Sequence, residues 1–131
     1  MTAKIFIFSG CLSAAAAVIM GAFGAHALKT TLPESLMAVY QTAFRFHMLH
    51  SLGLIAVALI MLQVKKSTLI EIAGWMMLCG IFLFSGSLYA LAVTQVRWLG
   101  MLTPLGGTAF IAAWLMVAAG AIKSAPSARK P

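Results

Sequence analysis

Four long apolar segments follow one another along the chain, and short polar connections separate them. About 20 consecutive apolar residues allow a helix to cross the hydrocarbon core of a bilayer. Inside lipid, backbone polar groups must be satisfied within the segment itself, so we expect each segment to be an α-helix. The pattern predicts an all-α integral membrane four-helix bundle over residues 1–123, with spans at about 5–28, 44–62, 69–93 and 99–122.

The composition excludes an ordinary soluble domain. Of the 131 residues, 63% are hydrophobic and only 8% are charged, whereas soluble domains carry about 25% charged residues. The net charge of +7 comes from basic residues that stand singly or in pairs between the apolar segments. This placement is typical of membrane topology signals and does not indicate a nucleic-acid partner. Cys11 and Cys79 lie within apolar segments without metal or redox spacing, so we expect them to be small buried hydrophobic side chains.

The first apolar segment resembles a signal peptide in two respects. Lys4 precedes it, and Ala25-His26-Ala27 has the small-x-small form of a cleavage site. The segment is longer than the apolar region of a signal peptide, which covers about 7–15 residues, so we expect a retained helix. Small residues recur at every fourth position and predict a face for close helix packing: Ser9, Ser13, Ala17, Gly21 and Ala25.

The polar connection at 29–38 contains a signal for the start of the second helix. Thr31-Leu32-Pro33-Glu34 fits a capping box, in which Thr31 is the N-cap and Glu34 follows three residues later. The next residues form one apolar face. We therefore expect the first turns of this helix to lie in the membrane interface before the chain enters the bilayer.

The basic residues predict the orientation of the bundle. Lys4, Lys65, Lys66, Lys123, Arg129 and Lys130 fall on one side of the membrane, and Lys29, Arg45 and Arg97 fall on the other. The side richer in Lys and Arg is normally cytoplasmic. We therefore expect both termini in the cytoplasm, with residues 124–131 as a cytoplasmic basic tail.

Polar side chains gather at the helix ends that this topology places in the outer half of the membrane. On a helical wheel, His47 and His50 lie on one face of the second helix and Arg45 lies on the opposite face. Buried imidazole and hydroxyl groups without partners are costly, so we expect this cluster to face the bundle interior. The candidate ligand- or partner-binding residues are His26, Tyr40, Gln41, His47, His50, Ser85, Ser87, Tyr89 and Thr103.

The histidines also suggest a haem or metal site. His47 and His50 lie one turn apart on one helix, so they cannot bind opposite faces of one haem iron. A haem would need His26 together with His47 or His50. A divalent metal on the three histidines would lack a carboxylate ligand, because Glu34 lies in the connection and Glu71 lies near the other face.

No complete catalytic motif occurs in the sequence. The chain contains no Asp, and its Ser and Tyr residues have no nucleophile–base–orienter arrangement. Gly21-Ala-Phe-Gly24 lacks the Lys and the preceding strand of a phosphate-binding loop. The inner half offers no continuous polar path, which argues against transport by a monomer. We therefore expect a protein that is not an enzyme and holds no cofactor.

Four sequence blocks resemble those of one known family. They are Gly21-Ala-Phe-Gly-Ala-His26, Gln41-Thr42 with His50, Phe84-Ser-Gly-Ser-Leu-Tyr89 and Thr103-Pro-Leu-Gly-Gly107. The chain is similar, over essentially its whole length, to small bacterial inner-membrane proteins described as domain of unknown function 423. Mitochondrial proteins of the transmembrane protein 256 type are relatives of this family. The resemblance implies a four-span bundle in the bacterial inner membrane and implies no activity. His47 departs from the family pattern, in which some members carry Gln.

Two hypotheses on function follow from the sequence. The favoured one is a non-enzymatic protein of the bacterial inner membrane. Its polar cluster in the outer leaflet would bind a lipid, a quinone-like ligand, a partner membrane protein or a second copy of the chain. The alternative is a small haem- or metal-binding redox protein that uses His26 with His50.

Overall fold

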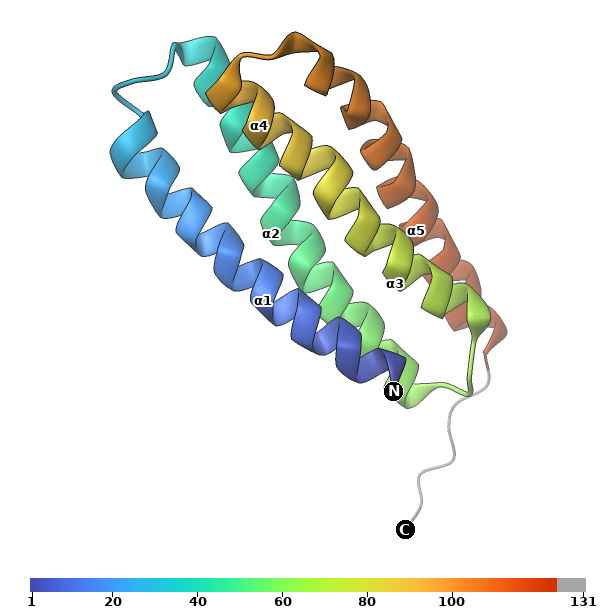
Figure 1. Ribbon diagram of the computed structural model, residues 1–131. Coiled ribbons are helices and arrows are strands. Elements are labelled where there is room, and N and C mark those ends of the chain that lie inside the picture. Colours follow the sequence, from blue (N-terminus) through green and yellow to red (C-terminus); the bar gives the residue numbers. More distant parts are fainter. Residues whose placement is uncertain (125–131) are drawn as a thin grey trace.

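The computed structural model describes residues 1–124, which fold into four long helical stretches running antiparallel in one bundle (Figure 1). Each stretch is long and apolar enough to cross a membrane. The all-α class predicted from the sequence is thus confirmed. Of the predicted tail at 124–131, all but Ser124 lies outside the described residues. The elements are α1 (Thr2–Phe23), η1 (Gly24–Leu28), α2 (Glu34–Gln63), α3 (Thr68–Gly80), η2 (Ile81–Gly86), α4 (Ser87–Thr94), η3 (Arg97–Leu102) and α5 (Thr103–Lys123).

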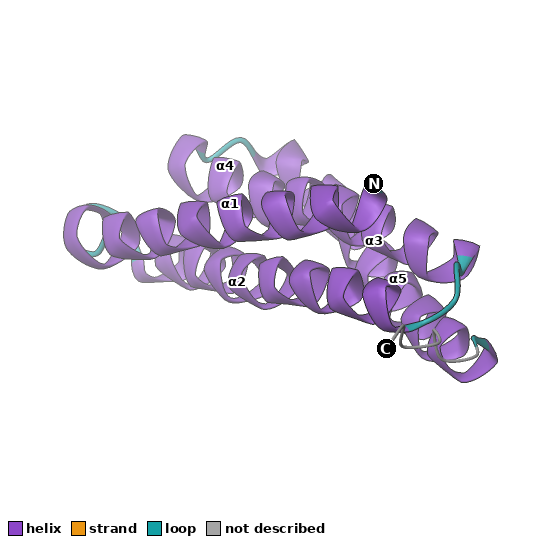
Figure 2. Ribbon diagram, turned by 90° about the horizontal axis from the view of Figure 1, so that it is seen from below, coloured by secondary structure: helices purple, strands orange, loops and turns teal. Residues whose placement is uncertain are grey.

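The bundle consists of two helix pairs joined by α2. α1 packs along α2 and α3 packs along α5, while α2 also contacts α3, η2 and α4. Seen from below, α1 and α2 run side by side (Figure 2). Thr2 and Lys123 lie at one end of the bundle, here called the terminal end (Figure 1). The connections at 29–33 and 95–96 lie at the other end, here called the distal end.

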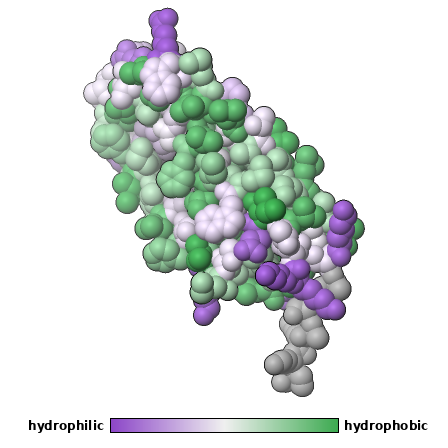
Figure 3. Space-filling view, turned by 45° about the vertical axis from the view of Figure 1, so that its right-hand side comes forward, coloured by the Kyte–Doolittle hydropathy of each residue, from purple (hydrophilic) through white to green (hydrophobic). Residues whose placement is uncertain are grey.

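The outer surface has the polarity expected of a protein surrounded by lipid. Figure 3 shows mostly apolar side chains over the middle of one face, with hydrophilic side chains gathered towards its two ends. Large apolar side chains point outwards: Phe8 and Phe82 are each 70% exposed. An apolar surface this extensive marks a membrane contact. It agrees with the membrane location predicted from the composition.

Two apolar cores fill the bundle. The larger one, here called the terminal core, includes Phe6, Leu54, Ile70, Met77 and Phe110. The smaller one, here called the distal core, lies nearer the distal end. It comprises Leu28, Tyr40, Ala43, Leu88, Tyr89 and Ala92.

Glycines let the helices approach closely at two points. A Cβ atom added to Gly74 would collide with the ring of Phe6, and one added to Gly106 would collide with the backbone of Phe84. Helix association in lipid depends on such close packing, because lipid is as apolar as the helix surfaces and gives little hydrophobic driving force.

Three short stretches depart from the α-helix, and the hydrophobic pattern predicts none of them. η1 and η2 are π-helical, and η3 is a 3₁₀-helix. They lie at the middle or towards the distal end of their stretches. π-Helical turns are rare and occur frequently at functional sites, so η2 directs attention to the middle of the bundle.

Two local predictions are wrong. Thr31 does not cap α2: the N-cap is Pro33, and the Thr31 hydroxyl donates instead to the carbonyls of Ala27 and Leu28, at 3.3 and 3.2 Å. Thr31 lies in the turn after η1, three residues beyond Leu28, so its hydroxyl reaches back to the carbonyls of that helix end. Cys11 and Cys79 are exposed rather than buried. In a lipid-facing surface a small apolar side chain is as well placed outside as inside.

Candidate functional site

A layer of polar side chains lies between the two cores. It consists of Ser13 on α1, His47 and Ser51 on α2, Ser85 in η2 and Tyr89 on α4, and we call it the polar layer. Ser13, His47 and Ser85 lie near the middle of their helical stretches. The layer therefore crosses the middle of the bundle rather than its outer half. The sequence places it nearer the helix ends because the second span is predicted to start at 44. α2 in fact begins at Glu34, so His47 lies several turns inside the helix.

Four of these side chains form one continuous row of hydrogen bonds. The Ser13 hydroxyl lies 2.7 Å from the Ser51 hydroxyl and 3.0 Å from Nε2 of His47. Ser51 donates to the carbonyl of His47 at 2.7 Å. At the other end of the row, Nδ1 of His47 lies 3.4 Å from the Tyr89 hydroxyl.

The direction of each bond follows from the bond between Ser51 and the carbonyl of His47. A backbone carbonyl can only accept, so the single proton of Ser51 is used there and Ser51 accepts from Ser13. Ser13 must then accept from the Nε2–H of His47. In a neutral imidazole this leaves Nδ1 as the acceptor for the Tyr89 hydroxyl.

Ser85 is the exception in this layer. Its side chain is 1% exposed, and within the described residues its Oγ has no hydrogen-bond partner. Leaving a buried hydroxyl unpaired costs about 1–3 kcal/mol. The other buried serines, Ser51 and Ser87, both donate to backbone carbonyls. An unpaired buried hydroxyl in a π-helical turn therefore needs an explanation.

Ser85 lines a groove of about 390 Å³ between α1 on one side and η2 with α4 on the other, here called the lateral groove. Polar and apolar side chains share its lining, with Ser9, Ser13, His47, Ser85 and Tyr89 supplying the polar groups. Its apolar lining includes Leu12, Leu78, Ile81 and Phe82. A volume of this size lies within the range of about 300–1,000 Å³ that is common for small-molecule sites.

Tyr40 supports the layer from the distal core and does not line the lateral groove. Its hydroxyl donates to the carbonyl of Met20 at 2.7 Å. Its ring packs edge-to-face on the ring of Tyr89, with the centroids 4.9 Å apart. Tyr40 therefore fixes the position of Tyr89 and links α1 to α2.

His50 faces a different helix from His47. Its Nδ1 donates to the carbonyl of Phe46 at 2.8 Å, and its ring stacks on Phe110 of α5 with 3.4 Å between the centroids. The side chain is buried, as the wheel predicts, but it is absent from the lining of the lateral groove. Two residues three apart on a helix differ by about 60° around its axis. That difference turns His47 towards α1 and His50 towards α5.

Ser87 and Thr103 form a separate contact. The Ser87 hydroxyl donates to the carbonyl of Phe84 at 3.0 Å and lies 3.3 Å from the Thr103 hydroxyl. Since the proton of Ser87 is used on Phe84, Thr103 donates in the second bond. This contact joins α4 to the start of α5 and lies outside the lateral groove.

His26 and Gln41 do not join the polar layer. Both are exposed, His26 on η1 and Gln41 near the start of α2. His26 is therefore not brought together with His50, as the haem hypothesis requires. Among residues 1–124, no group of three or more His, Cys, Asp or Glu side chains is arranged to hold a metal ion.

Sequence reasoning missed one member of the polar layer and left another out of the candidate binding residues. It assigned Ser13 only to a small-residue packing face. The helical wheel places Ser51 on the face of His47, one turn away, but Ser51 was not counted among the binding residues. For Ser13 the sequence gives no such signal, because only the packing of α1 on α2 brings the two serines together.

Comparisons with known proteins identify relatives but no activity. Residues 20–107 match the family model described as "Protein of unknown function (DUF423)". The chain is 47% identical over 120 residues to UPF0382 membrane protein YwdK of Bacillus subtilis, covering 92% of this chain and 98% of the relative. It is 44% identical, with the same coverage, to UPF0382 membrane protein SSP2132 of Staphylococcus saprophyticus. No solved structure matches the chain.

Proposed function

The chain belongs to the DUF423 family of membrane proteins, and from that premise we propose that it binds a lipid-soluble, quinone-like molecule in the lateral groove. It is a multi-pass protein of the bacterial inner membrane. In this proposal the protein is not an enzyme: it holds its ligand inside the bilayer, where lipid-soluble molecules reside.

The single observation that carries the proposal is the unpaired hydroxyl of Ser85. The row from Tyr89 to the carbonyl of His47 uses the protons of its own members. Ser85 therefore provides the buried free donor of the groove, and a ligand that pairs with it must present an acceptor. A quinone carbonyl is such an acceptor, and the apolar lining of the groove suits the quinone ring.

Binding of decyl-benzoquinone, measured by calorimetry in detergent, tests the proposal. Ser85→Ala should weaken binding about threefold to tenfold, because one net hydrogen bond contributes about 0.5–1.5 kcal/mol. The same change should leave thermal stability unchanged or raise it, since it removes an unpaired buried hydroxyl.

Ser87→Ala is the matched control. It removes a second buried serine near the π-helical turn that has partners and lies outside the groove. This variant should lose some stability and keep wild-type quinone binding. Equal binding by wild type and Ser85→Ala would contradict the proposal. Equally tight binding of an alkane of matching length would assign the groove to an acyl chain instead.

We also propose that both termini are cytoplasmic. Four described basic residues lie at the terminal end, namely Lys4, Lys65, Lys66 and Lys123, against three towards the distal end. In a background with both native cysteines replaced by Ala, a cysteine at Ser35 should react with a membrane-impermeant maleimide on intact cells. A cysteine at Ser67 should react only after lysis. The reverse pattern would invert the assignment.

A further inference from the structure

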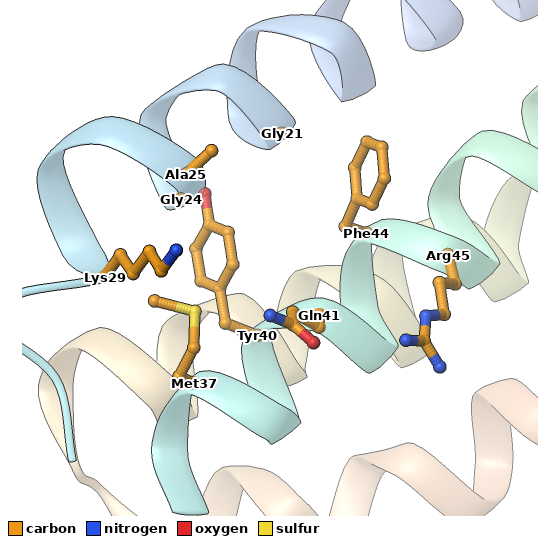
Figure 4. Close-up of a pocket in the computed structure, with 9 residues that line it drawn as sticks. All are labelled: Gly21, Gly24, Ala25, Lys29, Met37, Tyr40, Gln41, Phe44 and Arg45. Atoms are coloured by element: carbon orange, nitrogen blue, oxygen red, sulfur yellow. The ribbon is translucent and has the colours of Figure 1, made fainter. Parts of the chain in front are cut away.

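A second groove, of about 410 Å³, lies at the distal end between the end of α1 with η1 and the first turns of α2 (Figure 4). We call it the distal groove. It shares no lining residue with the lateral groove. The argument below is therefore independent of the function proposed for the lateral groove.

The polar lining of the distal groove is cationic. Lys29, from the end of η1, and Arg45, from α2, both line it, with Gln41 between them on α2 (Figure 4). The chain has only two acidic residues, Glu34 and Glu71, and neither lines the groove. Two positive charges without a negative one favour an anionic ligand.

The remaining lining is apolar and closely fitted. The ring of Phe44 lies against Gly21, where an added Cβ would come within 2.6 Å of it. The ring of Tyr40 lies against Gly24 in the same way, at 2.5 Å. The Tyr40 hydroxyl already donates to the carbonyl of Met20. This part of the groove therefore suits a hydrocarbon chain.

The depth of Arg45 indicates where the anion comes from. Arg45 lies about 17 Å along α2 from Glu34, at about 1.5 Å per residue. The Arg45 side chain is exposed. A long basic side chain in this position extends towards the membrane surface, so that its guanidinium reaches the headgroup region or the edge of the hydrocarbon. A lipid phosphate is an anion fixed at that level. A phosphate ion from solution would lose part of its hydration on binding and, unlike a lipid, has no acyl chain to pack on Phe44 in compensation.

We propose that the distal groove binds one anionic phospholipid. Its phosphate pairs with Lys29 and Arg45, and one acyl chain lies over Gly21 and Phe44. A headgroup with net negative charge is preferred to a zwitterionic one, because the cationic part of a zwitterion would repel the two basic side chains.

Native mass spectrometry of the detergent-purified protein tests this. With equal amounts of phosphatidylglycerol and phosphatidylcholine of identical acyl chains, the wild type should retain one phosphatidylglycerol. The double variant Lys29→Gln with Arg45→Gln should reduce that retention at least tenfold. The charge reversal Lys29→Glu should also reduce it. All three changes are at exposed positions, so folding should persist, and circular dichroism checks it.

The matched control is Lys65→Gln with Lys66→Gln, which removes the same charge at the terminal end. It should leave phosphatidylglycerol retention unchanged. Equal losses from both double variants would mean general charge attraction and would overturn the site. Undiminished retention by the Lys29 and Arg45 variant would overturn it as well. Inorganic phosphate should not raise the melting temperature, and an increase matching that given by phosphatidylglycerol would assign the groove to the free ion.

Discussion

The interior of the terminal half of the bundle is regular and apolar, whereas the interior from the middle to the distal end is irregular and contains buried polar side chains. In the terminal half the stretches are α-helical, and the buried side chains are those of the terminal core. From the middle towards the distal end lie the two π-helical stretches, the 3₁₀-helix and all of the buried polar side chains of the described chain. From this comparison we expect the terminal half to contribute most of the stability. Both proposed binding grooves lie from the middle of the bundle to its distal end.

The largest effect on stability should come from the terminal core. Phe6 is fully buried and packs on Gly74 and Trp75. Phe6→Ala should lower the free energy of unfolding by about 3 kcal/mol, the low end for a buried Phe, because in lipid mainly the packing part is lost. Phe8→Ala, at a lipid-facing position, should be nearly neutral. Reversible unfolding in mixed micelles measures both. Similar losses would mean that the terminal core is not the stabilising half.

An intermediate effect is expected where α5 meets η2. A Cβ at position 106 would meet the backbone of Phe84, which no side-chain rotation can relieve. Gly106→Ala should therefore cost about 2 kcal/mol, as is usual for overpacking. Gly86→Ala is the matched control, because nothing lies within 4 Å of its added Cβ. It should stabilise the protein slightly. Equal thermal stability of the two variants would show that α5 and η2 can move apart at this contact with little cost in free energy.

The smallest effect should come from the polar layer. His47→Leu removes two side-chain hydrogen bonds, to Ser13 and Tyr89. At about 0.6 kcal/mol for each such bond in a membrane protein, the expected loss is about 1 kcal/mol. His47→Gln should lose less, because an amide can also donate to one partner and accept from the other. If His47→Leu lowered the free energy of unfolding as much as Phe6→Ala, the terminal half would not be the main source of stability.

Four helices long and apolar enough to cross a membrane could be predicted from the sequence, because the length of an apolar run is read directly along the chain. The inward face of α2 could also be predicted, since Tyr40, His47 and His50 follow the helical period. The site could not, because it depends on which helix each residue meets. The helical wheel places His47 and His50 on one face, yet His50 stacks on Phe110 while His47 lies in the groove. The π-helical turn that holds Ser85 leaves no mark in the hydrophobic pattern.

The hydrogen-bond row from Tyr89 to Ser51 has a consequence for the movement of protons. A row of hydroxyl and imidazole groups through the middle of a membrane protein is the usual material of a proton wire. Here the row turns back and ends on the carbonyl of His47, a group with no proton to pass on. Within the described residues, this row by itself therefore gives protons no continuous path from one end of the bundle to the other.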